Sequence, residues 1–83
     1  MSTLSSTELK QAVALLEQGD WQAAHVIVQK DEDAALPCWI HGVVHVLEGD
    51  LENARYWYGA AKRDFPQPYS VAEEIAALKN ACG

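Results

Sequence analysis

The chain has 83 residues, 49% of them hydrophobic, and twelve acidic against six basic side chains give it a formal net charge of −6. This apolar content is too high for a disordered chain, and the length allows one small domain, taken as residues 1–83. An acidic chain repels phosphate backbones, which excludes nucleic acid as an expected partner. The sequence shows neither a secretory signal nor a run of about 18 apolar residues. We therefore expect a cytoplasmic protein without a membrane partner.

The first predicted helical hairpin covers residues 5–30. Ser5 and Glu8 have the spacing of a capping box, so a helix should begin at the residue after Ser5. Gly19 can take the positive φ that ends a helix, and Asp20 can cap the helix that follows. The apolar residues of both helices recur with the period of one helix face, at Leu9, Ala12, Val13, Leu16, Trp21, Ala24, Ile27 and Val28.

A second hairpin of the same design is predicted at residues 34–65. Gly49 and Asp50 repeat the turn of Gly19 and Asp20 at an offset of 30 residues. Repetition at such a period is typical of stacked helical hairpins, in which each unit buries its apolar face against the next.

A final helix is predicted at residues 70–81. Pro66 and Pro68 interrupt the preceding helix, and Ser70 with Glu73 forms another capping-box pair. We expect this helix to cap the open end of the stack. The predicted fold class is therefore all-α, with about five helices: two hairpins and a C-terminal capping helix.

The second hairpin resembles a tetratricopeptide repeat. The repeat has large residues and a Leu-Gly pair in its first helix, then small residues, an aromatic residue and a closing proline. The corresponding positions here are Cys38, His41, Gly42, His45, Ala54, Tyr58, Ala61 and Pro66. The resemblance implies a tetratricopeptide-like scaffold that binds proteins or peptides. The sequence pattern HxxxHxxEGDxxNARYWY, from His41 to Tyr58, is also similar to that of small uncharacterised bacterial proteins.

One face of the central predicted helix is apolar and is the candidate partner-binding surface. It carries Leu36, Trp39, Val43 and Leu47. A patch of this size is rarely left bare, so we expect a protein or peptide, or a second copy in a homodimer, to cover it. The expected function is a small interaction module and not an enzyme, because nothing in the sequence indicates an oxyanion hole or a substrate cleft beside Cys38.

The opposite face carries Cys38, His41, His45 and Glu48, at steps of three, four and three residues. The two criteria for orienting this helix disagree. Amphipathicity alone buries the Trp39 side and leaves the histidines in water. The repeat resemblance instead places the histidines against the second helix of the hairpin.

Two interpretations of the histidines stay open. The HxxxH spacing puts two imidazoles at ligand distance, and His25 and Cys38 could complete a site for a divalent metal such as zinc, in a metal- or pH-sensing protein. Alternatively, the imidazoles are structural, without a cofactor, and bond within the core to the hydroxyls of Tyr56 and Tyr58.

Overall fold

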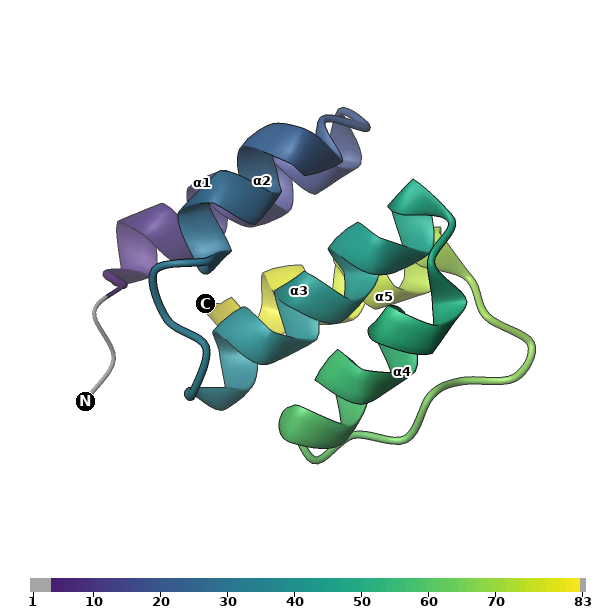
Figure 1. Ribbon diagram of the computed structural model, residues 1–83. Coiled ribbons are helices and arrows are strands. Elements are labelled where there is room, and N and C mark those ends of the chain that lie inside the picture. The colour runs from purple at the N-terminus through teal and green to yellow at the C-terminus, as the bar shows by residue number, and fades with distance from the viewer. Residues whose placement is uncertain (1–3, 83) are drawn as a thin grey trace.

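The computed structural model describes residues 4–82 (Figure 1). These residues form five helices and no strand, which confirms the all-α class. The helices are α1 (Ser6–Glu17), α2 (Trp21–Val28), α3 (Ala35–Glu48), α4 (Leu51–Ala60) and α5 (Val71–Cys82). None of the helices in this part of the chain is long and apolar enough to cross a membrane.

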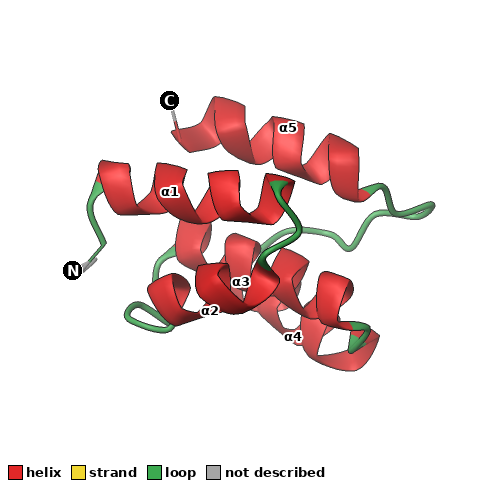
Figure 2. Cartoon of the chain, turned by 90° about the horizontal axis from the view of Figure 1, so that it is seen from above, coloured by secondary structure: helices red, strands yellow, loops and turns green. Residues whose placement is uncertain are grey.

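The helices lie in two layers, which are seen from above in Figure 2. One layer holds α1 and α5, and the other holds α2, α3 and α4. α1 packs on α2, and α3 packs on α4, as two successive hairpins, while α2 packs on α3 and joins the hairpins. α3 therefore contacts each of the other four helices and is the central element of the core.

Local sequence sets most of the helix ends. Ser5 Oγ accepts the backbone N–H of Glu8 at 3.1 Å, and the backbone N–H of Ser5 donates to the Glu8 carboxylate at 3.3 Å, which completes the predicted capping box. Asp20 and Asp50 each accept a backbone N–H in the first turns of α2 and α4. Gly49, with φ of 94°, ends α3 in the left-handed conformation that glycine adopts without strain. These boundaries depend on neighbours in sequence, so the sequence alone predicts them.

α3 is buried on both of its faces. Every residue from Pro37 to His45 is buried. α5 covers the side that carries Trp39 and Val43, while α2 and α4 cover the side that carries His41 and His45. The sequence indicated two conflicting orientations of this helix, with either the Trp39 side or the histidine side buried. Both sides are buried in the structure, because the middle of α3 is covered by other helices on each side.

The position of α5 revises two expectations. α5 packs on α1 and α3 and does not extend the row of helices past α4. It also covers the apolar patch that we expected a partner to occupy: Trp39 is only 4% exposed, Val43 is completely buried, and Leu36 and Leu47 are partly buried. The physical reason is that the apolar stripe of α5 supplies within one chain the contact that we assigned to a second chain.

A buried polar network, which we call the Glu74 network, holds α5 in place. Glu74 Oε1 accepts the indole N–H of Trp39 at 3.1 Å and the hydroxyl of Tyr58 at 2.6 Å. The Tyr58 and Tyr69 hydroxyls are also hydrogen-bonded, at 2.6 Å. Burial, and then the bond to Glu74, raises the pKa of Tyr58, so its hydroxyl stays protonated and donates. Glu74 therefore links α3, α4 and α5 through one carboxylate oxygen.

Candidate metal centre

Three histidines meet where α2 packs on α3. His25 comes from α2, and His41 and His45 come from successive turns of α3. His25 Nε2 and His41 Nε2 are 2.9 Å apart. The ring centroids of the three pairs are separated by 4.7, 5.4 and 5.3 Å. The structure thus brings together all three histidines that the sequence singled out, and we call them the histidine cluster.

The packing of α2 on α3 places His25 at the edge of the core. Its neighbours Ala24 and Val28 on α2 are completely buried. His41 and His45 are also buried, at 2% and 8% exposure, whereas His25 is only partly buried. His25 is therefore the member of the cluster through which solvent has access.

His41 is held by ring stacking. Its imidazole lies on the indole of Trp57, with centroids 3.8 Å apart and planes inclined by 3°. Its second nitrogen, Nδ1, is buried and has no hydrogen-bond partner among residues 4–82. The expectation that Tyr56 or Tyr58 would serve the histidines is wrong, because Tyr58 belongs to the Glu74 network and Tyr56 is 66% exposed. Sequence reasoning missed the role of Trp57.

His45 is oriented by Glu48, one turn further along α3. His45 Nδ1 and Glu48 Oε1 are 2.8 Å apart. A carboxylate only accepts hydrogen bonds when ionised, so His45 Nδ1 carries the proton and donates it to Glu48. Nε2 is then the nitrogen of His45 that is available to a metal. A carboxylate that orients an imidazole in this way is a regular feature of histidine metal sites.

The protonation of the cluster suits a metal ion. Burial, and then the neighbouring His25 and His45, lowers the pKa of His41 from 6.5 to about 4. Burial, and then His45, also lowers the pKa of His25, while Glu48 and Glu32 act in the opposite direction. Both rings are therefore neutral at pH 7, as metal-binding imidazoles must be. Their Nε2 atoms share a hydrogen bond, so one of the two nitrogens carries a proton, which has to move to Nδ1 before both can bind an ion.

Cys38 lies outside the cluster, although it shares the helix face with His41. Its thiol is completely buried and donates to the carbonyl oxygen of Glu32 at 3.3 Å. Burial, followed by the nearby acidic residues, raises the pKa of Cys38. The thiol is therefore protonated at neutral pH and is turned towards the loop before α3. The prediction that Cys38 contributes a ligand is not supported by this arrangement.

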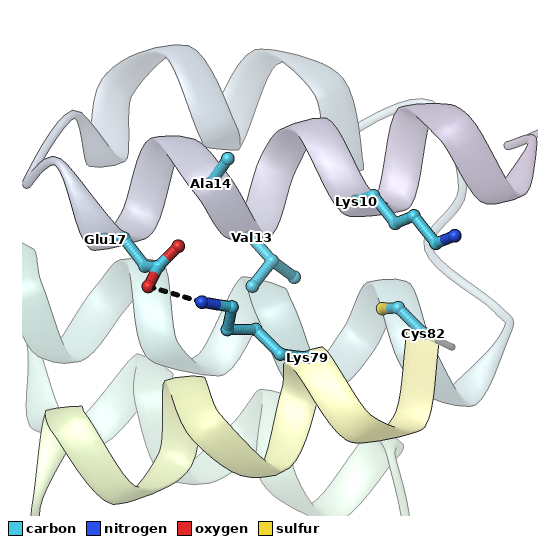
Figure 3. Close-up of a pocket in the computed structure, with 6 residues that line it drawn as sticks. All are labelled: Lys10, Val13, Ala14, Glu17, Lys79 and Cys82. Atoms are coloured by element: carbon cyan, nitrogen blue, oxygen red, sulfur yellow. Dashed lines mark hydrogen bonds and ion pairs between the residues drawn. The ribbon is translucent and has the colours of Figure 1, made fainter.

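A hollow of about 330 Å³ lies between α1 and α5, beside their contact (Figure 3). It is lined by Lys10, Val13, Ala14, Glu17, Lys79 and Cys82. The ammonium of Lys79 pairs with Glu17 at 2.8 Å. Burial raises the pKa of the Cys82 thiol, so it is a weak nucleophile at neutral pH. The charges here are already paired or lie near solvent, and we keep the histidine cluster as the candidate site.

Comparison with known proteins adds no further assignment. No protein-family model, curated protein or solved structure matches this chain. The resemblance to tetratricopeptide repeats therefore stays a prediction from the sequence.

Proposed function

We propose that this chain binds one divalent transition-metal ion, with zinc the best fit, through His25, His41 and His45. One observation carries the proposal: one nitrogen from each ring can be chosen so that all three lie within 4.8 Å of one another. Imidazole nitrogens are donors that suit zinc, copper and nickel, whereas calcium and magnesium prefer oxygen.

The spacing of the donors agrees with a small adjustment on binding. Zinc–nitrogen bonds of about 2.0–2.1 Å in a tetrahedron place two nitrogens about 3.3 Å apart. The Nε2 atoms of His25 and His41 are 2.9 Å apart without the ion. Small ring rotations would therefore open the cluster enough to admit zinc. Because His25 is only partly buried, it can move without disturbing the core.

Burying His41 has a cost that an apolar side chain stacked on Trp57 would avoid. A buried polar atom without a hydrogen bond costs about 1–3 kcal/mol, and His41 Nδ1 is such an atom. A metal held through His41 Nε2 would not give Nδ1 a partner, so the proposal is supported by the meeting of three imidazoles in one place and not by this atom.

Metal binding at this position would join the two hairpins. His25 belongs to the hairpin of α1 and α2, whereas His41 and His45 belong to the hairpin of α3 and α4. An ion that binds only the folded chain adds about 2.7 kcal/mol of stability at a free concentration 100 times its Kd. The proposed function is thus that of a small metal-responsive domain, whose stability reports the availability of the ion.

Zinc titration against a coloured chelator tests this proposal. We expect one zinc ion per chain, and His25→Ala should lower the affinity by at least about tenfold, since it removes a ligand while the buried core stays intact. Gln22→Ala, an exposed change on the same helix, is the matched control and should bind zinc as the parent does. Circular dichroism checks that each variant is folded.

Two results would contradict the metal proposal. One is a parent protein that takes up no stoichiometric zinc. The other is a folded His25→Ala variant that binds zinc as tightly as Gln22→Ala does. Either result would favour imidazoles that serve only as hydrogen-bonding groups.

We do not place a protein partner on the patch of Leu36, Trp39, Val43 and Leu47. α5 of the same chain lies on that surface, and Trp39 donates to Glu74 within it. A partner could reach these side chains only by displacing α5.

A further inference from the structure

This inference rests on the proposed metal site and concerns the ligand that a bound ion would still need in addition to the three histidines. Among residues 4–82, the group that can surround one ion at the cluster has three members, His25, His41 and His45. A tetrahedral zinc ion takes four ligands. Sites with four protein ligands are closed and structural, whereas sites with three keep a position for an outside ligand.

The other donor groups near the cluster are occupied elsewhere. Glu48 accepts from His45 Nδ1, on the far side of that ring from Nε2. Asp50 caps α4 and accepts from the backbone and side-chain N–H groups of Asn53 at 3.3 and 3.0 Å. The thiol of Cys38 donates to the loop before α3. None of these groups joins all three histidines in one metal-sized set.

We propose that the metal bound by the histidine cluster keeps a fourth coordination position, filled by water and open to a small neutral nitrogen donor such as imidazole. Access is on the side of His25, the one member of the cluster that is partly exposed.

Charge around the site favours a neutral ligand over an anion. Glu32 and Glu48 are the carboxylates that act on the ring of His25. Asp50 forms a further group with His45 and Glu48 in which the donor atoms lie within 4.8 Å of one another. Carboxylates near the cluster repel an incoming anion, whereas they do not act on the net charge of imidazole, which is zero.

Cobalt(II) substitution tests the open position, because the visible absorption of cobalt responds to each change of ligand. The cobalt protein should first show one ion per chain and no intense thiolate-to-cobalt band, and Cys38→Ser should leave its spectrum unchanged. Added imidazole should then change the spectrum with one-to-one saturation. Thiocyanate should bind roughly tenfold more weakly, because it is an anion.

The outcomes separate this inference from the proposed function. A cobalt protein with one bound ion whose spectrum ignores imidazole would overturn the open position and leave the metal site intact. A thiolate band that Cys38→Ser removes would overturn it as well, since Cys38 would then be the fourth ligand. Failure to bind cobalt or zinc at all would overturn the metal site itself. Glu32→Gln with thiocyanate gives an internal check, because Glu32 is exposed and acts on His25 through its charge alone. Removing that charge should strengthen thiocyanate binding and leave imidazole binding nearly constant.

Discussion

The hydroxyl of Tyr58 on α4 donates to the carboxylate of Glu74 on α5 at 2.6 Å, inside the core. The same oxygen accepts the indole N–H of Trp39 at 3.1 Å. Glu74→Ala would leave the buried indole N–H of Trp39 without its acceptor, and the Tyr58 hydroxyl would keep only its bond to Tyr69. Since one buried unpaired group costs about 1–3 kcal/mol, we expect the free energy of unfolding to fall by about that amount in urea denaturation followed by circular dichroism.

Asn80→Ala is the matched control for this prediction. Asn80 lies on the same helix, α5, and its side chain is exposed. An exposed substitution of this kind should change the free energy of unfolding by less than about 0.5 kcal/mol. Equal losses in the two variants would show that the Glu74 network does not stabilise the fold.

The two glycines that lie within helices should respond to alanine in opposite directions. A Cβ at Gly42 would lie 2.5 Å from Cδ1 of Tyr58, whereas a Cβ at Gly59 would have nothing within 4 Å. Gly42→Ala should therefore cost about 1–3 kcal/mol through overpacking. Gly59→Ala should gain about 0.5–1 kcal/mol, because alanine restricts the unfolded chain and favours a helix. Thermal unfolding of both variants measures the difference. A Gly42→Ala variant as stable as the parent would contradict the close approach of α3 and α4.

Stability without metal should fall as the solution becomes acidic. The pKa of His41 is about 4 in the folded protein and 6.5 ordinarily, so the unfolded chain takes up a proton first as the pH drops below 6.5. The contribution of neutral His41 to the free energy of unfolding is complete above pH 6.5 and is lost progressively towards pH 4. At about 1.4 kcal/mol for each pKa unit, the loss approaches about 3 kcal/mol. Urea unfolding at several pH values, with a chelator present, measures this slope.

His41→Phe supplies the comparison for the pH prediction. Phenylalanine can keep the stacking on Trp57 and cannot take up a proton. We expect a shallower loss of stability between pH 6.5 and 4.5 in this variant, with the remaining slope due to other groups such as His25. Identical slopes in parent and variant would mean that the pKa of His41 is not lowered by folding.

Glu48→Gln should weaken zinc binding without unfolding the chain. The Glu48 carboxylate accepts the His45 Nδ1 proton, and its side chain is 40% exposed, so its replacement should have little effect on the core. Partners that orient a metal-bound histidine are worth about 10–100-fold in affinity. Competition with a coloured chelator measures the change, and Glu52→Gln, an exposed neighbour on α4, should leave the affinity unaltered.

The parts of the structure that local signals determine could be predicted from the sequence. The capping box of Ser5 and Glu8 and the turn at Gly49 define helix ends through contacts within a few residues. The approach of His25 to His41 could also be predicted from the sequence, because it depends on how successive hairpins stack. Packing of this kind has a regular geometry that the spacing of apolar residues indicates.

Other features depend on contacts between distant segments and left no signal in the periodicity. The apolar face of Trp39 could be covered by any amphipathic helix, so its contact with α5 of the same chain was not predictable. Trp57 and Tyr58 are adjacent, and the pattern did not show that the first would stack on His41 while the second bonds to Glu74. The pairing of a buried carboxylate with two donors needs three helices in place.

The connection between α4 and α5, residues 61–70, joins a large part of the chain, α1 to α4, to a small part, α5. Lys62 and Arg63 in this connection are exposed and offer trypsin a cleavage point. After cleavage, the piece that carries α5 would remain attached through noncovalent contacts, which include the Glu74 network, the ion pair of Lys79 with Glu17 and the ring contact of Phe65 with Tyr58. Closure of the core would then be a bimolecular reaction, so burial of the Trp39 indole would depend on protein concentration. The protein could in this way serve as a split reporter, with a helical peptide as its second component.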